Sequence, residues 1–209
     1  SFITNKNGSL RKLGLEDIPE AALAKSPIFS FASIFVSPLF DVPAMTSLFR
    51  SIKEKGGLLC ADMTRCKNGE TLEDIRPALA YIDYLFPNYE EARAVSGRDT
   101  PEDIADAFLD CGLSCLVLKL GSKGCFLKSR QTAALVPAFP DARCIDTTGA
   151  GDNFAAGFLY ALSEGMDPVE CARFACAAAS LAVESVGAGT GVRSLEQVLD
   201  RYQNMPLAE

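Results

Sequence analysis

The chain has 209 residues, 48% of them hydrophobic, and a net charge of −7 at pH 7. A chain of this length suits one globular domain, and its acidic balance argues against a nucleic-acid partner, which would require a basic face. The longest apolar runs fall short of the roughly 20 residues that span a bilayer, and the chain does not open with a secretory signal pattern. We therefore expect no membrane partner and a cytoplasmic location.

The strand and helix signals alternate along the chain. Residues 2–13 predict a hairpin around Asn7-Gly8, a strong turn signal. Apolar runs then predict strands at 27–36, 57–61, 82–86, 114–120, 124–129 and 132–137, the last two antiparallel. Helical patterns and capping residues predict helices at 43–55, 71–81, 88–96 and 151–164, with further helices beginning at Thr100, Asp167 and Ser194.

This alternation predicts an α/β fold in which helices cover both faces of a mostly parallel sheet. Ligands of such folds bind at the carboxyl ends of the strands, where loops lead into helices. Three segments with chemically informative residues fall at these positions: 87–91, 121–124 and 146–152.

Histidine is absent, and eight cysteines are present. A general base that acts near neutral pH must therefore be a carboxylate, Lys, Cys or Tyr, and a Ser-His-Asp hydrolase is excluded. No C-x-x-C pair occurs, which argues against a zinc site. Disulfides are an alternative, but several cysteines lie in apolar runs, and we interpret them as small buried hydrophobic residues.

Residues 146–154, DTTGAGDNF, form a glycine-rich turn that leads into an apolar helix. The small residues Gly149, Ala150 and Gly151 let an anion approach their backbone N–H groups, where the start of a helix favours negative charge. The lysine typical of phosphate loops is absent, and Asp152 follows instead. The alternative is a tight turn that needs a positive φ, with Asp152 simply placed in the first turn of the helix.

This string is similar to the D-T-x-G-A-G-D-x-F signature of the ribokinase-like (PfkB) carbohydrate kinases, and the following Ala-Ala-Gly-Phe extends the match. The resemblance implies a three-layer αβα ribokinase-like fold and an enzyme that transfers phosphate from ATP to a sugar hydroxyl. It implies that Gly149, Ala150 and Gly151 form an anion hole and that Asp152 is the catalytic base. A carboxylate can orient the hydroxyl and accept its proton late in phosphoryl transfer.

Residues 88–91, NYEE, have two interpretations. Asn88 can cap a helix while Glu91 reaches back to it, as a capping box does. The resemblance adds a second role, because an N-x-x-E motif at this place organises Mg²⁺ and the nucleotide phosphates in the family. It assigns Asn88 to the nucleotide and, with Glu91, to Mg²⁺, which needs few protein carboxylates. The two roles are compatible.

Residues 118–124, LKLGSKG, end a predicted strand in a turn. Any β-turn could have this sequence, but the resemblance places Gly121, Ser122 and Gly124 at the nucleotide. Lys119 either meets a phosphate or is a surface lysine. Residues 184–192 either stop a helix with glycine or, as the resemblance implies, pass the adenine at Gly187.

The family implies two further features. In some members a monovalent cation such as K⁺ binds close to the residue that corresponds to Asp146. Sugar-kinase relatives also often read D-x-N-x-R at the place of residues 62–66, where Asp62 matches but the Asn and Arg are replaced. Arg65 or Lys67 therefore either contacts a phosphate or forms a solvated charge pair.

The resemblance covers nearly the whole chain but not the family's first third. We expect residues 1–209 to be one kinase domain that lacks this third and most of the β-sheet lid through which relatives form homodimers. The sequence around 30–41 and 80–92 resembles bacterial kinases of 2-keto-3-deoxygluconate or fructose. A kinase of a nucleoside, a sugar phosphate or a vitamin, and a non-catalytic nucleotide-binding protein, are alternatives. A Rossmann dehydrogenase is excluded, because no Gly-x-Gly-x-x-Gly follows the first strand.

Overall fold

A computed structural model describes residues 11–67 and 69–208 of the chain. Its strands are β1 (Ile28–Ile34), β2 (Leu58–Met63), β3 (Tyr84–Leu85), β4 (Cys115–Lys119), β5 (Cys125–Ser129) and β6 (Ala133–Val136). Its helices are α1 (Glu20–Lys25), α2 (Val42–Glu54), α3 (Leu72–Leu79), α4 (Tyr89–Ser96), α5 (Pro101–Asp110), α6 (Ala150–Ser163), α7 (Pro168–Ala182) and α8 (Leu195–Gln203), with short 3₁₀ turns η2 (Leu15–Asp17) and η3 (Gly121–Lys123).

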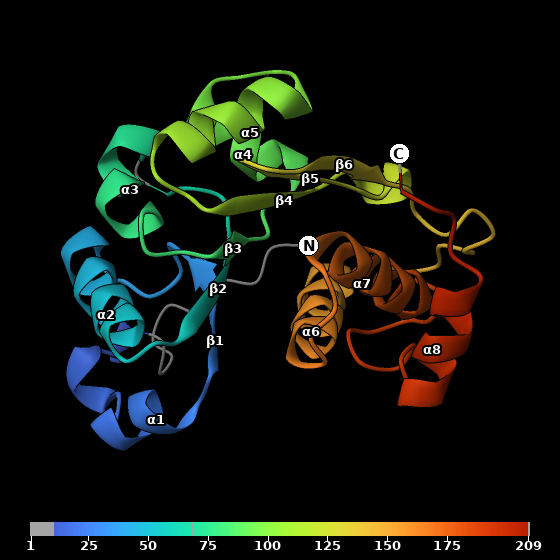
Figure 1. Cartoon of the computed structure of the whole chain (residues 1–209), viewed down its shortest axis with the longest axis horizontal. Coiled ribbons are helices and arrows are strands. Elements are labelled where there is room, and N and C mark those ends of the chain that lie inside the picture. Colours follow the sequence, from blue (N-terminus) through green and yellow to red (C-terminus); the bar gives the residue numbers. More distant parts are fainter. Residues whose placement is uncertain (1–10, 68, 209) are drawn as a thin grey trace.

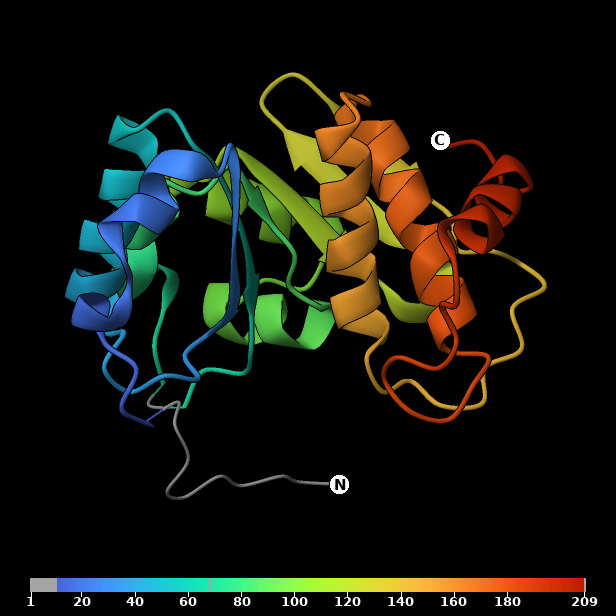
Figure 2. The same cartoon turned by 90° about the horizontal axis from the view of Figure 1, so that it is seen from below.

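The six strands form one sheet in the order β1-β2-β3-β4-β5-β6. The first four strands are parallel to one another, and β5 runs antiparallel to both of its neighbours. Helices α2, α3, α4 and α5 cover one face, and α6, α7 and α8 lie over the other (Figures 1 and 2). This arrangement confirms the predicted three-layer α/β fold with a mostly parallel sheet.

The two faces of β4 show why its sequence is apolar throughout. Leu116 and Leu118 belong to the hydrophobic core beneath α2–α5, whereas Cys115 and Val117 belong to the core beneath α6–α8. Successive side chains of a strand point to opposite faces, so a strand with helices on both sides buries every residue. The first four residues of β4 are accordingly buried.

Local capping fixes the helix starts that the sequence predicts. Thr100 Oγ1 accepts a hydrogen bond from the backbone N–H of Asp103 at 3.1 Å, and Ser194 Oγ accepts one from Gln197 at 3.2 Å. Asp167 caps α7 in the same manner. Each cap satisfies backbone donors that the helix itself leaves unpaired.

Three differences from the predicted elements stand out. Residues 2–10 of the predicted hairpin lie outside the described residues, and residues 11–13 belong to no strand. The predicted second strand is wrong there, because a turn signal is local whereas a strand also requires a partner. Helix α1 was not predicted. The strand predicted at 82–86 is assigned only to β3, although flanking hydrogen bonds from Asp83 to Leu59 and from Phe86 to Ala61 continue the pairing with β2.

The cysteines behave as small apolar residues. All eight are free thiols, and six of them are buried. Within the described residues, no helix combines the length and apolar character needed to cross a membrane.

Candidate catalytic and phosphate-binding site

The carboxyl edge of the parallel strands gathers polar side chains from three neighbouring segments. Asp62 lies near the end of β2, Asn88 follows β3 and Lys119 ends β4. The backbone N–H of Lys119 donates to the Pro87 carbonyl at 2.9 Å, and Asn88 forms a parallel bridge with Lys119. The backbone pairing therefore sets the register that aligns these residues at one edge.

An ion pair crosses this edge. Lys119 Nζ lies 3.0 and 3.1 Å from the two carboxylate oxygens of Asp62, and the side chains are only 15% and 18% exposed. Burial raises the pKa of Asp62 above its usual value although Lys119 lowers it, and the charge of Asp152 adds to the rise. Asp62, Lys119 and Asp152 thus lie within electrostatic range of one another.

The glycine turn presents free backbone donors. Gly149 is the N-cap of α6 with a φ of 77°, and no side chain caps this helix. The N–H of Ala150 donates a hydrogen bond to Thr147 O within the turn, at 3.2 Å. Within the described part of the chain, the N–H groups of Gly149, Gly151 and Asp152 have no partner. The turn thus has the predicted positive φ and also the donors that an anion requires at a helix start.

The loop after α7 packs directly on this turn. A β-carbon built on Gly149 would lie 2.6 Å from both Cα and O of Ala188. Asn153 Nδ2 donates to Gly149 O at 2.8 Å and to Ala188 O at 2.9 Å, which joins the two segments. The backbone N–H of Gly187 donates to Asp146 at 2.9 Å. The turn and the loop therefore form one unit.

Asp146 anchors this unit. One of its oxygens accepts hydrogen bonds from the N–H and the hydroxyl of Thr148, at 2.9 and 2.7 Å, and the other accepts from Gly187. The Gly187 N–H, followed by Thr148, lowers the pKa of Asp146. The carboxylate thus orders two backbone segments, and its assignment to a cation remains a prediction.

Asn88 and Glu91 form the predicted capping box at the start of α4. Asn88 Oδ1 accepts from the Glu91 N–H at 2.9 Å, and the Asn88 N–H donates to Glu91 Oε2 at 3.0 Å. Burial raises the pKa of Glu91, Lys119 opposes this rise, and Asp62 adds to it. The capping box thus engages Glu91 Oε2, and a hydrogen bond with the Asn88 side chain also lowers the pKa of Glu91.

The carboxylates at this edge fit a divalent cation such as Mg²⁺, most of whose ligands are water molecules and phosphate oxygens. The ammonium of Lys119 acts on the carboxylates of Asp62 and Glu91, and the charge of Asp152 acts on Asp62. In the described ranges, no three acidic or cysteine side chains come together as a closed metal site. Mg²⁺ keeps several waters and needs only one or two protein carboxylates, so Asn88 and Glu91 fit the role that the resemblance gives them.

The turn after β4 has a structural reason for its last glycine. Gly124 has a φ of 94°, and a β-carbon there would lie 2.0 Å from Val136 O. Gly121 and Ser122 are exposed at the same carboxyl edge. Their place is consistent with the predicted nucleotide contact, whereas Gly124 is required by the close approach of the backbone to β6.

The sequence analysis does not predict the ion pair between Lys119 and Asp62. The signal that could have indicated it is their position, since each residue lies at the carboxyl end of a predicted buried strand. By contrast, Arg65 and Lys67 are exposed, and the backbone N–H of Lys67 donates to Glu70 at 3.0 Å. Neither contacts the residues of the glycine turn in the described structure.

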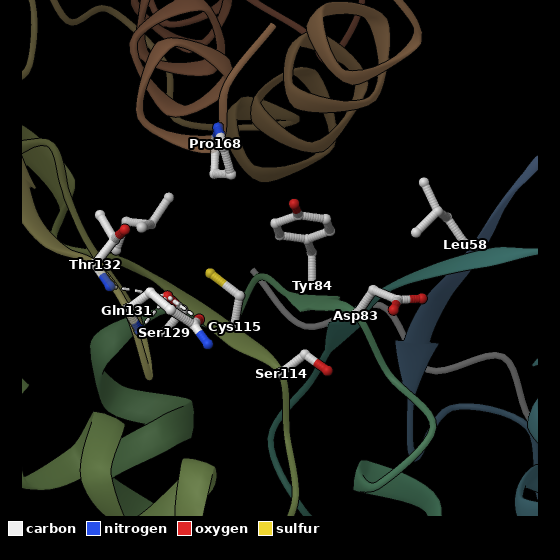
Figure 3. Close-up of a pocket in the computed structure, with 10 residues that line it drawn as sticks. Leu58, Asp83, Tyr84, Ser114, Cys115, Ser129, Gln131, Thr132 and Pro168 are labelled. Atoms are coloured by element: carbon white, nitrogen blue, oxygen red, sulfur yellow. Dashed lines mark hydrogen bonds between the residues drawn. The ribbon is translucent and has the colours of Figure 1, made fainter. Parts of the chain in front are cut away.

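A cavity of about 300 Å³ lies at the opposite, amino edge of the strands (Figure 3). Tyr84 lines it from the start of β3, Asp83 from the residue just before that strand, and Pro168 faces them from the start of α7. The carboxylate of Asp83 is already paired with Lys53 at 2.6 Å and accepts from the Leu59 N–H at 2.7 Å. The cavity therefore lacks a free charged group and is not the candidate site.

The sheet order, the glycine turn at a helix start and the acidic carboxyl edge define a three-layer α/β protein with a candidate anion site at that edge. Residues 1–195 match the family model described as pfkB family carbohydrate kinase. The chain belongs to this family.

Curated relatives that match the chain are also named as sugar kinases. The chain is 40% identical over 124 residues to a ribokinase of Arabidopsis thaliana, a match that covers 56% of this chain and 33% of the relative. It is 31% identical over 116 residues to the 2-dehydro-3-deoxygluconokinase of Bacillus subtilis (strain 168), covering 56% of this chain and 36% of the relative. The matched part thus spans about a third of each of these two proteins.

Solved structures match over more of the chain. A putative ribokinase II of E. coli in complex with ATP and Mg²⁺ has a TM-score of 0.82 and 25% identity, covering 97% of this chain and 67% of that chain. Arabidopsis thaliana ribokinase complexed with ribose and ATP has a TM-score of 0.75 and 28% identity, covering 91% of this chain and 60% of that chain. These neighbours confirm the ribokinase-like fold.

Proposed function

We propose that this chain carries the ATP-binding and phosphoryl-transfer site of a sugar kinase. The observation that carries the proposal is the glycine turn, where unpaired backbone N–H groups lie at the start of α6 beside the exposed carboxylate of Asp152. Phosphoryl transfer depends mainly on positioning and on charge stabilisation. A turn that offers anion donors next to a base meets both needs.

In the proposed reaction, Asp152 accepts a hydrogen bond from the sugar hydroxyl. The hydroxyl oxygen forms a bond to the γ-phosphorus as the bond between that phosphorus and the bridging oxygen of ADP breaks. The hydroxyl proton passes to Asp152, and ADP leaves with the electron pair of the broken bond. The N–H groups of Gly149 and Gly151 stabilise the charge on the transferring phosphoryl oxygens.

The nucleotide lies along the same edge in this proposal. Gly121 and Ser122 contact it from the turn after β4, and Gly187 contacts it from the loop that Asp146 anchors. Asn88 and Glu91 hold Mg²⁺, which when bound neutralises part of the phosphate charge. A monovalent cation beside Asp146 and a homodimer are further expectations from the resemblance. A K⁺ titration of the rate and sedimentation of the intact protein test them.

The substrate class rests on the relatives. The named relatives act on ribose or 2-dehydro-3-deoxygluconate, and one neighbour was solved with ribose and ATP. We therefore propose a small sugar or sugar acid as the acceptor.

An ADP-release assay on a panel of pentoses, hexoses and keto-deoxy sugar acids tests the proposal. We expect Mg²⁺-dependent ADP release with at least one of them. Calorimetry with ATP separates the main rival, a non-catalytic nucleotide-binding protein of the same fold. ATP binding without release on any sugar, in the intact protein, would favour that rival.

A further inference from the structure

The ammonium of Lys119 occupies an unusual position at the carboxyl edge. It donates to both oxygens of Asp62, and a β-carbon built on Gly151 would lie 3.2 Å from Lys119 Nζ. The charge therefore lies between a carboxylate and the backbone of the glycine turn. The side chain is mostly buried, so its place is fixed rather than one of many solvated conformers.

The ion pair of Lys119 and Asp62 differs from another partly buried ion pair in the fold, whose role is structural. Lys53 and Asp83 also form a partly buried pair, but Asp83 additionally accepts the N–H of Leu59 and so ties down a strand start. Asp62 instead accepts the N–H of its own neighbour, Met63. Its Lys119 partner reaches across the end of β3 from a strand that is not adjacent to β2.

The charge balance at the edge favours a role for this cation. The Lys119 ammonium acts on the carboxylates of Asp62 and Glu91, and Asp152 adds a further negative charge that acts on Asp62. A triphosphate entering this edge adds further negative charge, and like charges at close range oppose binding. A lysine whose ammonium lies beside Gly151 of the glycine turn can compensate this repulsion directly.

We propose that Lys119 is the lysine of this phosphate site, supplied by β4 because the glycine turn itself has none. When ATP binds, Lys119 Nζ donates hydrogen bonds to the terminal phosphate beside Gly151, and Asp62 holds the ammonium in place beforehand. Lys119 forms no covalent bond in this role, so the bond changes of the transfer are those given above. This inference rests on the proposed function.

The test compares a non-hydrolysable ATP analogue with ADP, because only the analogue carries the terminal phosphate. In the intact protein with Mg²⁺, we expect Lys119→Met to weaken analogue binding by roughly 10- to 100-fold, the loss of a charge-assisted hydrogen bond. Affinity for ADP should change by less than about threefold. Lys119→Arg, which keeps the charge, should recover much of the loss. Lys53→Met is the matched control and should lower thermal stability without changing either affinity.

A second comparison separates phosphate contact from a structural pair. Asp62→Asn breaks the same ion pair but leaves the positive charge, so we expect a smaller loss of analogue affinity than in Lys119→Met. Equal losses in these two variants, or equal losses for the analogue and ADP, would overturn the inference while the proposed kinase activity stands. A wild-type protein that binds neither nucleotide would overturn both.

Discussion

Replacing Gly149 by alanine tests whether the glycine turn and the loop after α7 act as one unit. Gly149 has a φ of 77°, and an added β-carbon would lie 2.6 Å from the backbone of Ala188. Ordinary carbon contacts lie near 3.5 Å, so the loop would have to move by about 0.9 Å. That movement strains the hydrogen bonds from Asn153 to Ala188 and from Gly187 to Asp146.

The magnitude follows from two costs. A left-handed conformation costs a residue with a β-carbon about 1–2 kcal/mol, and each strained hydrogen bond contributes about 1 kcal/mol. With two strained hydrogen bonds, we therefore expect Gly149→Ala to lower the free energy of unfolding by about 3–4 kcal/mol. Gly165 provides the control, because its φ is 76° and a β-carbon there would meet nothing within 4 Å. Gly165→Ala should cost only about 1–2 kcal/mol.

Equilibrium urea unfolding measures both costs, and calorimetry with ATP measures the consequence for the site. We expect Gly149→Ala to weaken ATP binding at least about tenfold, whereas Gly165→Ala leaves it unchanged. Equal losses of stability and equal ATP affinities in the two variants would refute the coupling between turn and loop.

Glu91→Gln keeps an oxygen that can accept the Asn88 N–H and removes only the charge. Because burial raises the pKa of Glu91, we expect the thermal stability of Glu91→Gln at pH 7 to be unchanged or slightly higher. We expect its Mg²⁺-dependent ATP binding to be about tenfold weaker. Unchanged ATP binding would mean that Glu91 acts only as part of the helix cap. The pKa of Asp146 is lower in the folded than in the unfolded state. Asp146 therefore stabilises the fold at pH values above its unfolded-state pKa, and this contribution is lost as the pH falls through its folded-state pKa, below about pH 4. Acid unfolding of Asp146→Asn should therefore show a weaker pH dependence there than that of the wild type, and identical profiles would contradict this reasoning.

Signals contained in a few residues predicted the structure well. The starts of α5 and α8 lie where Thr100 and Ser194 predict them, because an N-cap acts on donors only three residues away. Helix α1 was missed although Glu20–Lys25 reads EAALAK, a run of strong helix formers. Its N-cap, Pro19, makes no side-chain hydrogen bond, so propensity was the available signal.

Contacts between distant residues could not be predicted from local patterns. Asp62 and Lys119 are 57 positions apart, and their pairing depends on how β2, β3 and β4 align at one edge. Gly124 looked like part of an ordinary turn, and only the approach of Val136 O shows why a side chain is excluded there. The DTTGAGD string located the site because several of its residues act within one turn.

Asp152→Asn in the intact protein tests the central claim most directly. The substitution keeps the shape of the side chain but removes the base, and Glu102→Gln in the first turn of α5 controls for the loss of a negative charge at a helix start. We expect ADP release with the preferred sugar to fall by roughly 100-fold or more in Asp152→Asn, with ATP affinity within about threefold of the wild type. Near-normal turnover in Asp152→Asn would contradict the assignment of Asp152 as the base.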